Sequence, residues 1–169
     1  MLNRGTHRLL IRKDALKFSS AHMTVFPGGT KENLHGHNYQ VSIRLDVPKA
    51  DLSEMIPFHE VKKAAKQICD LWDEKVLLAS LCPEMKGRRE ADGSVQFELC
   101  GKKYLLPMDE VVWLEADNVT SESLSKLFAI SLAKRLEKIL AQASVSRLEV
   151  KVEETPGQGA SYILSGGAK

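Results

Sequence analysis

Three histidines near the start of the chain have the spacing of a metal site. In the segment His35-Gly36-His37 the two imidazoles share one face if the segment is a strand, because strand side chains alternate with a period of two. The residues that follow alternate between apolar and polar, which marks this face as the buried one. The stretch that ends at His22 alternates too, and the turn residues of Pro27 to Thr30 separate the two stretches. We expect the chain to fold about this turn and to put His22 roughly across from His37. The apolar alternate positions are Leu16 and Phe18 before His22, and Tyr39, Val41, Ile43, Leu45 and Val47 after His37.

Three converging imidazoles without a fourth protein ligand are typical of a catalytic zinc site, which leaves one coordination position open. The alternative is that these are hydrogen-bonded core histidines, the usual role of a buried histidine. The third histidine in register favours the metal.

A carboxylate near the C-terminus also falls on a buried face. Leu148, Val150 and Val152 are apolar at alternate positions, and Glu154 continues that series whereas Glu153 does not. A carboxylate on such a face must find a hydrogen-bonding partner, because burial without one is costly. Glu154 is therefore a candidate site residue. The alternative is that the strand ends at Val152 and Glu154 bends into solvent.

The periodicity of the apolar residues predicts an α+β protein with the order β-β-α-(insert)-α-β-β. The expected elements are a hairpin over about 6–48, a helix over about 57–78, a less regular region over 80–113 with a small hairpin, a helix over about 121–142 and a hairpin over 145–164.

Composition sets modest limits on the function. The 169 residues fit one domain with a core, 43% of them are hydrophobic, and the formal net charge of +2 is compatible with a small anionic substrate. The basic residues are scattered, so nucleic-acid binding gains no support. Cys69, Cys82 and Cys100 form no motif, which favours a reducing compartment. No segment has the pattern of a signal peptide or a membrane span, so we expect a cytoplasmic protein.

Three sequence strings resemble the 6-pyruvoyltetrahydropterin synthase / 6-carboxytetrahydropterin synthase family. They are Phe18-Ser19-Ser20-Ala21-His22, Leu34-His35-Gly36-His37-Asn38-Tyr39 and Val152-Glu153-Glu154-Thr155-Pro156. The resemblance implies a single tunnelling-fold (T-fold) domain over 1–169, with a four-stranded antiparallel sheet and two helices on one face. The segment from about 82 to 114 is then an accessory insertion. Subunits of this family form trimers that stack into hexamers, so a homo-oligomer is implied.

The resemblance also implies roles for individual residues. Zinc would be held by His22, His35 and His37, and the carboxylate of Glu154 would accept hydrogen bonds from the pterin ring, a charge-assisted contact that offsets its burial. The other implied substrate-binding residues are Thr120 and Thr155.

One departure from the family pattern points to a particular reaction. The catalytic cysteine of the pyruvoyl- and carboxy-forming members is replaced by Lys31, and Glu32 follows it to give Glu-x-x-His-Gly-His. This spacing resembles the subgroup that converts 7,8-dihydroneopterin triphosphate to 6-hydroxymethyl-7,8-dihydropterin in folate synthesis. We therefore expect Glu32 to act as general base in a retro-aldol cleavage. The alternative is that Glu32 is a solvated loop carboxylate.

A second departure concerns the family's Asp-His pair after the first helix, which reads Asp73-Glu74 here. Glu74 could replace the missing histidine in a proton relay, which makes Asp73 and Glu74 candidate catalytic residues. Two other functions stay open. One is a pyruvoyl- or carboxy-forming synthase with a base other than cysteine, and the other is a non-catalytic pterin-binding relative.

Overall fold

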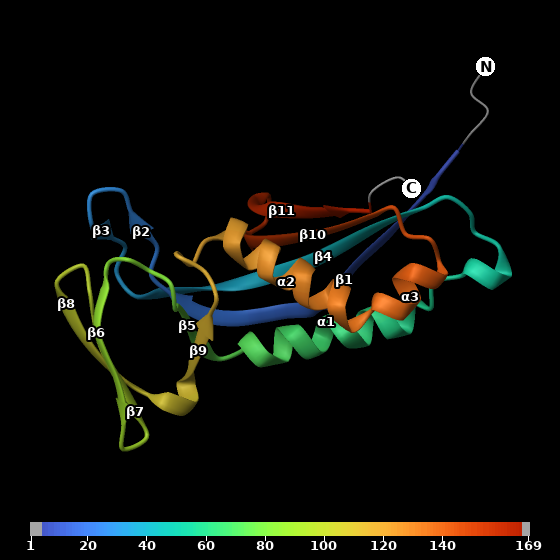
Figure 1. Ribbon diagram of the computed structural model, residues 1–169. Coiled ribbons are helices and arrows are strands. Elements are labelled where there is room, and N and C mark those ends of the chain that lie inside the picture. The colour runs from blue at the N-terminus through green and yellow to red at the C-terminus, as the bar shows by residue number, and fades with distance from the viewer. Residues whose placement is uncertain (1–4, 167–169) are drawn as a thin grey trace.

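The computed structural model describes residues 5–166, which form a six-stranded mixed sheet with two long helices on one face (Figure 1). The strand order is β11-β10-β4-β1-β5-β9, and every pairing among the first four is antiparallel. The expected α+β class and four-stranded antiparallel core are therefore confirmed. The strands of the sheet are β1 (His7–His22), β4 (His35–Val47), β5 (Lys75–Ala79), β9 (Val111–Leu114), β10 (Arg147–Thr155) and β11 (Gln158–Ser165).

The β1–β4 pair forms the centre of the sheet, and its side chains divide cleanly between two faces. Phe18 pairs with Tyr39, and their rings stack with centroids 4.8 Å apart on the face under the helices. The register shifts between Arg12 and Lys17, where β1 bulges. Burial of alternate apolar side chains supplies the main driving force for this arrangement.

The helix predicted over 57–78 is shorter in the structure, because α1 (Phe58–Trp72) ends before a fifth strand begins. Glu74 has a positive φ of 56°, and its N–H donates to the Ser19 carbonyl oxygen at 2.7 Å. This turn sends Lys75–Ala79 along β1 in parallel. The final part of the predicted helix is thus strand β5.

The helix predicted over 121–142 is interrupted at Leu136. α2 (Ser121–Arg135) packs on the sheet, and α3 (Glu137–Gln142) continues it after a break. Leu136 has φ −105° and ψ 10°, outside helical values, and its side chain is buried. None of the described helices is long and apolar enough to cross a membrane.

The region expected to be an accessory insertion contains a separate three-stranded antiparallel sheet rather than a simple hairpin. Its strands are β6 (Met85–Ala91), β7 (Ser94–Leu99) and β8 (Lys102–Pro107). β9 lies within the same predicted segment but joins the edge of the main sheet beside β5. Short 3₁₀ turns occur at Leu52–Glu54 and Met108–Glu110.

The connection between β1 and β4, residues 23–34, forms a small hairpin of its own. Its strands are β2 (Val25–Phe26) and β3 (Thr30–Lys31), and Gly28 and Gly29 both have positive φ in the turn between them. This hairpin lies at the same end of the molecule as β6 to β8, away from the two termini (Figure 1).

Candidate metal and active site

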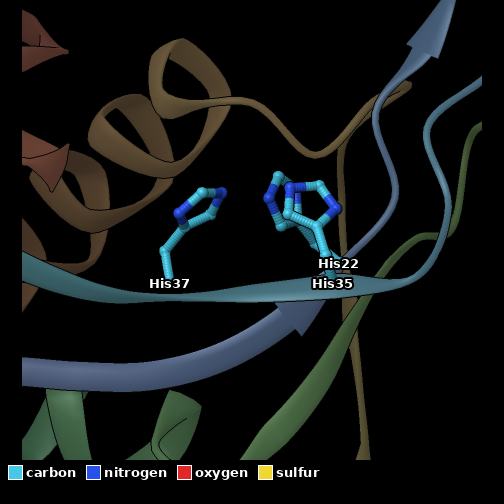
Figure 2. A group of neighbouring side chains, drawn as sticks. All are labelled: His22, His35 and His37. Atoms are coloured by element: carbon cyan, nitrogen blue, oxygen red, sulfur yellow. The ribbon is translucent and has the colours of Figure 1, made fainter.

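The three histidines come together where β1 ends and β4 begins. His22 pairs with His35, and Ser20 pairs with His37, so the expected pairing of His22 with His37 is wrong by two residues. The shift leaves every imidazole on the same face. One ring nitrogen from each histidine lies within 4.8 Å of the others, and Figure 2 shows the three rings projecting toward the segment that leads into α2.

Backbone carbonyls orient two of the three rings. The Nδ1 atom of His22 lies 3.1 Å from the Val119 carbonyl oxygen, and that of His35 lies 2.9 Å from the Asn33 carbonyl oxygen. A carbonyl can only accept, so each Nδ1 carries the proton and each Nε2 presents a lone pair. Sequence reasoning missed Val119, because any residue type supplies the same carbonyl.

The chemistry of this donor set fits a metal ion. His22 is 1% exposed, and its Nε2 atom is buried without a hydrogen-bond partner. Burial lowers the pKa of His22, which favours the neutral form that binds metals. An unpartnered buried nitrogen is costly unless something binds it.

The glycine between the histidines has a steric role. A Cβ atom on Gly36 would lie 2.9 Å from the Ser20 carbonyl oxygen on the neighbouring strand. Because this oxygen belongs to the backbone of a paired strand, it cannot move aside easily. The close approach of β1 and β4 at the histidine cluster therefore requires glycine.

Glu32 lies beside the histidine cluster. Its Oε2 atom is 3.9 Å from His35 Nε2, and its side chain is 40% exposed. The Glu32 N–H donates to the Thr24 carbonyl oxygen at 3.0 Å, which fixes the backbone of Glu32 to the residue that precedes β2. The carboxylate is thus both near the potential ligand atoms and open to a substrate.

Glu154 is half-buried at a bulge in β10, where the register with β11 shifts between Glu153 and Thr155. The negative charge of Glu154 acts to raise the pKa of His22, but the larger effect of burial lowers that pKa overall. Burial, followed by the charges of Glu154 and Glu32, raises the pKa of Tyr39, whose hydroxyl is buried without a partner. Glu154 is therefore close enough to act electrostatically on His22 and Tyr39, and Glu32 on Tyr39.

The adjacent carboxylate, Glu153, is engaged elsewhere. Its Oε1 atom accepts hydrogen bonds from Lys151 Nζ at 2.8 Å and from the Gly157 N–H at 3.1 Å. It belongs to a row of ion pairs on the sheet face that the helices leave uncovered. The expectation that Glu154 is the buried carboxylate of the pair is wrong: Glu153 is only 4% exposed, whereas Glu154 is half-buried at the bulge that interrupts the alternation of β10.

The two threonines have different surroundings. The Thr120 hydroxyl accepts a hydrogen bond from the Ser123 N–H at 3.3 Å and caps α2, while the Ser123 hydroxyl accepts from the Thr120 N–H. Thr155 is exposed beside the turn between β10 and β11.

Asp73 and Glu74 lie between α1 and β5, beside β1. Asp73 Oδ1 accepts a hydrogen bond from the Ser19 N–H at 2.7 Å. Glu74 lines a cavity of about 380 Å³ together with Ser19, Asn38 and one of the three histidines, His37. The side chains of Ser19 and Asn38 point to the sheet face opposite His22 and His37, because strand side chains alternate.

Comparisons with known proteins agree with the strings found in the sequence. A sequence model of the family described as 6-pyruvoyl tetrahydropterin synthase matches residues 11–164. A Methanocaldococcus jannaschii protein named "Putative 6-carboxy-5,6,7,8-tetrahydropterin synthase" is 35% identical over 148 residues, which span 87% of this chain and 89% of the relative. A Pyrococcus abyssi protein of the same name is 27% identical over 152 residues, or 88% of this chain and 87% of the relative.

Solved structures show the same fold. The 6-pyruvoyl tetrahydropterin synthase of Plasmodium vivax has a TM-score of 0.88 and 24% identity, and the match covers 95% of this chain and 99% of that one. Two variants of the P. vivax protein, in which a glutamate described as a catalytic residue is replaced by alanine or by cysteine, match equally well.

Proposed function

Because the chain belongs to the 6-pyruvoyl tetrahydropterin synthase family, whose tunnelling fold it shares, we propose that it is a zinc-dependent pterin lyase. Its proposed substrate is 7,8-dihydroneopterin triphosphate and its product 6-hydroxymethyl-7,8-dihydropterin, a folate precursor. The observation that carries this proposal is the Glu32 carboxylate 3.9 Å from His35 Nε2, in a chain with Lys31 where the family's cysteine would be. The catalytic glutamate of the P. vivax protein supports the same role.

The metal in this proposal is zinc, held by His22, His35 and His37. The unpartnered Nε2 of His22 and the carbonyl-fixed tautomers of His22 and His35 support this assignment. When bound, zinc would act as a Lewis acid that lowers the pKa of substrate hydroxyls.

Glu32 acts as the general base in the proposed reaction. It takes the proton from the C2′ hydroxyl, the new C2′ carbonyl forms, and the C1′–C2′ bond breaks with its electron pair left on C1′. The dihydropterin ring delocalises that pair until C1′ accepts a proton from the Glu32 carboxylic acid. The second product is the two-carbon aldehyde that carries the triphosphate. Atoms and charge balance without an oxidant or a reductant.

Glu154 is the proposed anchor of the pterin ring. Its half-buried carboxylate can accept two hydrogen bonds, one from the 2-amino group and one from a ring N–H. Its position at the bulge of β10 and its electrostatic effect on His22 and Tyr39 support this role. Thr120 and Thr155 are proposed to line the same pocket.

We infer that the working form is a homo-oligomer, a trimer or a hexamer. In residues 5–166 the outer edges of β11 and β9 have no partner strand, and unpaired sheet edges are ready to pair with another chain. Glu74 lines the same cavity as His37, which supports Glu74 as the proposed replacement for the family's missing relay histidine, with Asp73 beside it on Ser19.

A second candidate is the 6-carboxy- or 6-pyruvoyl-forming reaction, which the name of the M. jannaschii relative favours. Against it, the pKa of Cys69 is raised to about 12 by burial, and Cys82 is also buried. Cys100 lies at the turn between β7 and β8, and burial raises its pKa as well. A raised pKa disfavours the reactive thiolate.

The test is incubation of the zinc-loaded protein with 7,8-dihydroneopterin triphosphate, followed by mass spectrometry of the products. We expect 6-hydroxymethyl-7,8-dihydropterin. A carboxy or pyruvoyl product would keep the family's chemistry but overturn the role of Glu32. Unchanged substrate bound to the protein would indicate a pterin-binding protein that does not catalyse this reaction.

A further inference from the structure

The side chain that stands in place of the family's cysteine, Lys31, reaches the three-stranded sheet β6–β8 of the segment 82–114, here called the insertion. Lys31 Nζ lies 5.1 Å from the centre of the Tyr104 ring in β8. It also donates to the Glu32 carbonyl oxygen at 2.9 Å and contacts Met23 Sδ at 3.4 Å. A half-buried ammonium over an aromatic face is attracted to the ring. Lys31 thus links the backbone of Glu32 to the insertion.

Two further contacts join the same two parts of the molecule. Lys102 Nζ donates to Asn33 Oδ1 at 3.5 Å. At the tip of the small hairpin, Gly29 lies beside the Glu84 carboxylate, and an added Cβ would be in ordinary contact with its Oε2 atom at 3.4 Å. The hairpin that carries Glu32 therefore touches the insertion at its tip, along β3 and after β3.

Within the insertion, Tyr104 is fixed by aromatic packing. Tyr104 stacks on Phe97 with ring centroids 5.1 Å apart and an angle of 13° between the rings. Phe97 is 1% exposed and meets Trp113 of β9 edge-to-face. The chain of contacts from Lys31 thus reaches the main sheet through Tyr104, Phe97 and Trp113.

The opposite arm of the hairpin is held from another direction. Asn118 Oδ1 accepts a hydrogen bond from the Val25 N–H at 3.0 Å, and Asn118 Nδ2 donates to the Val25 carbonyl oxygen at 2.8 Å. β3 and Glu32 are thus held on one side by their pairing with β2 and Thr24, and on the other side by the contacts with the insertion.

We propose that the inserted sheet β6–β8 holds the Glu32 carboxylate in its reactive position, with Lys31 and Tyr104 as positioning residues. The proposal rests on the proposed function for the identity of the reaction, but the hold on the hairpin is a property of the fold. Neither residue needs to touch the substrate. A small displacement of a catalytic group is enough to slow a reaction greatly.

The first measurement is hydrogen exchange of the zinc-loaded full chain, read at the hydrogen-bonded amides of Gly29 and Glu32. Tyr104→Leu removes the ring face, and we expect these amides to exchange about 2- to 30-fold faster, the range that the strength of a cation–π contact allows. Tyr104→Phe keeps the ring and should exchange like the wild type. Lys103→Met, at an exposed residue of the same strand, is the matched control.

The second measurement is turnover of 7,8-dihydroneopterin triphosphate, with zinc content determined on the same samples. Tyr104→Leu and Lys31→Met should lower kcat about 10-fold or more and leave KM and bound zinc nearly unchanged, because the base acts on the reacting proton. Lys31→Arg keeps the cation and should restore most of kcat. Lys31 lies outside the inserted sheet, so Lys31→Met leaves the core of that sheet intact. An effect of this variant therefore cannot be attributed to local unfolding of the insertion, as an effect of Tyr104→Leu could be.

The outcomes separate this proposal from the proposed function. Unchanged exchange at Gly29 and Glu32 in both Tyr104→Leu and Lys31→Met overturns the hold of the insertion on the hairpin. Faster exchange with unchanged kcat overturns the positioning role. A wild type that does not turn over the substrate overturns the proposed function, while the exchange data still decide whether the insertion holds the hairpin.

Discussion

The protonation of the histidine cluster is set by main-chain atoms. The carbonyl oxygens of Val119 and Asn33 hold the Nδ1–H groups of His22 and His35 and so direct each Nε2 into the shared space. Outer contacts of this kind orient metal ligands and raise their basicity. Their cost to the protein is small, because these carbonyls need a partner in any case.

The first prediction at this scale concerns Glu32. Glu32→Gln keeps the size of the side chain but removes the base, so kcat should fall about 10²- to 10⁴-fold. Zinc content should not change, because the three histidines remain. Steady-state turnover and metal analysis check both statements, with Glu98→Gln on β7 as the control. Activity within about twofold of the wild type would contradict the role of Glu32.

A second prediction compares two neighbouring carboxylates. Glu154→Gln should weaken pterin binding about 10- to 100-fold, because a charge-assisted pair of hydrogen bonds is lost. Glu153→Gln should leave binding nearly unchanged, since Glu153 is engaged by Lys151 and the Gly157 N–H. Calorimetric titration with a dihydropterin measures both. Equal losses in the two variants would refute the assignment of Glu154.

The histidine cluster could be predicted from the sequence because it depends mainly on alternation. Parity determines which face a side chain occupies, but it does not determine the register between two strands. The loop 23–34 sets that register, and it pairs His22 with His35 rather than with His37. A shift of two residues keeps each side chain on the same face, so the histidines could be predicted to cluster even though the predicted register was wrong. Val119 and Tyr104 left no comparable signal, because their roles depend on contacts between distant segments.

At the scale of whole elements, tertiary pairing overrides local pattern. The run Val76-Leu77-Leu78 fits the end of a helix as well as a short buried strand, since short apolar runs do not distinguish the two. The structure uses it as a strand because β1 offers an open edge that pairs with Lys75 and Val76. The left-handed conformation at Glu74, uncommon for a residue other than glycine, turns the chain toward that edge.

The prediction for an element concerns the start of α2. Thr120→Ala removes the side-chain cap and should lower the free energy of unfolding by about 0.5–2 kcal/mol. Thr120→Ser keeps the hydroxyl and should retain most of the stability. Urea unfolding of the three zinc-loaded proteins measures this. An unchanged free energy of unfolding in Thr120→Ala would show that the cap contributes little. If Thr120 also lines the pterin pocket, this variant will in addition bind pterin more weakly.

Across the whole molecule the two faces of the sheet differ in how they are satisfied. The helices cover an apolar face, whereas the other face carries ion pairs within β10 and between β10 and the strands β4 and β1. Glu149 and Glu153 are only 6% and 4% exposed and are paired with basic side chains. These pairs are Arg12 with Glu153, Arg44 with Glu149, Arg147 with Glu149 and Lys151 with Glu153.

This charged face leads to a prediction about acid stability. The hydrogen bond from Lys151 lowers the pKa of Glu153 below its ordinary value of 4.5, so the folded protein binds fewer protons than the unfolded chain in that range. The contribution of ionised Glu153 to the stability of the folded protein is complete above about pH 4.5. It is lost as the pH falls through the lower pKa that Glu153 has in the folded state.

Urea unfolding at several pH values between about 6 and 3 tests the sign of this effect. Glu153→Gln should be less stable than the wild type at the upper end, and the difference should shrink as the pH falls. Protonation of the three histidines in acid would affect both proteins alike, so the difference isolates Glu153. A difference that grows toward low pH would contradict this account.

The tight approach of Gly36 to the Ser20 carbonyl bears on protein design. A designer who grafts the three histidines onto the antiparallel hairpin of an unrelated scaffold would need to bring the glycine as well. Any larger residue there would push the two strands apart, since its Cβ would begin only 2.9 Å from that oxygen. The smallest unit to transfer is therefore four residues on two strands, the three histidines proposed to bind metal and the glycine that has no side chain.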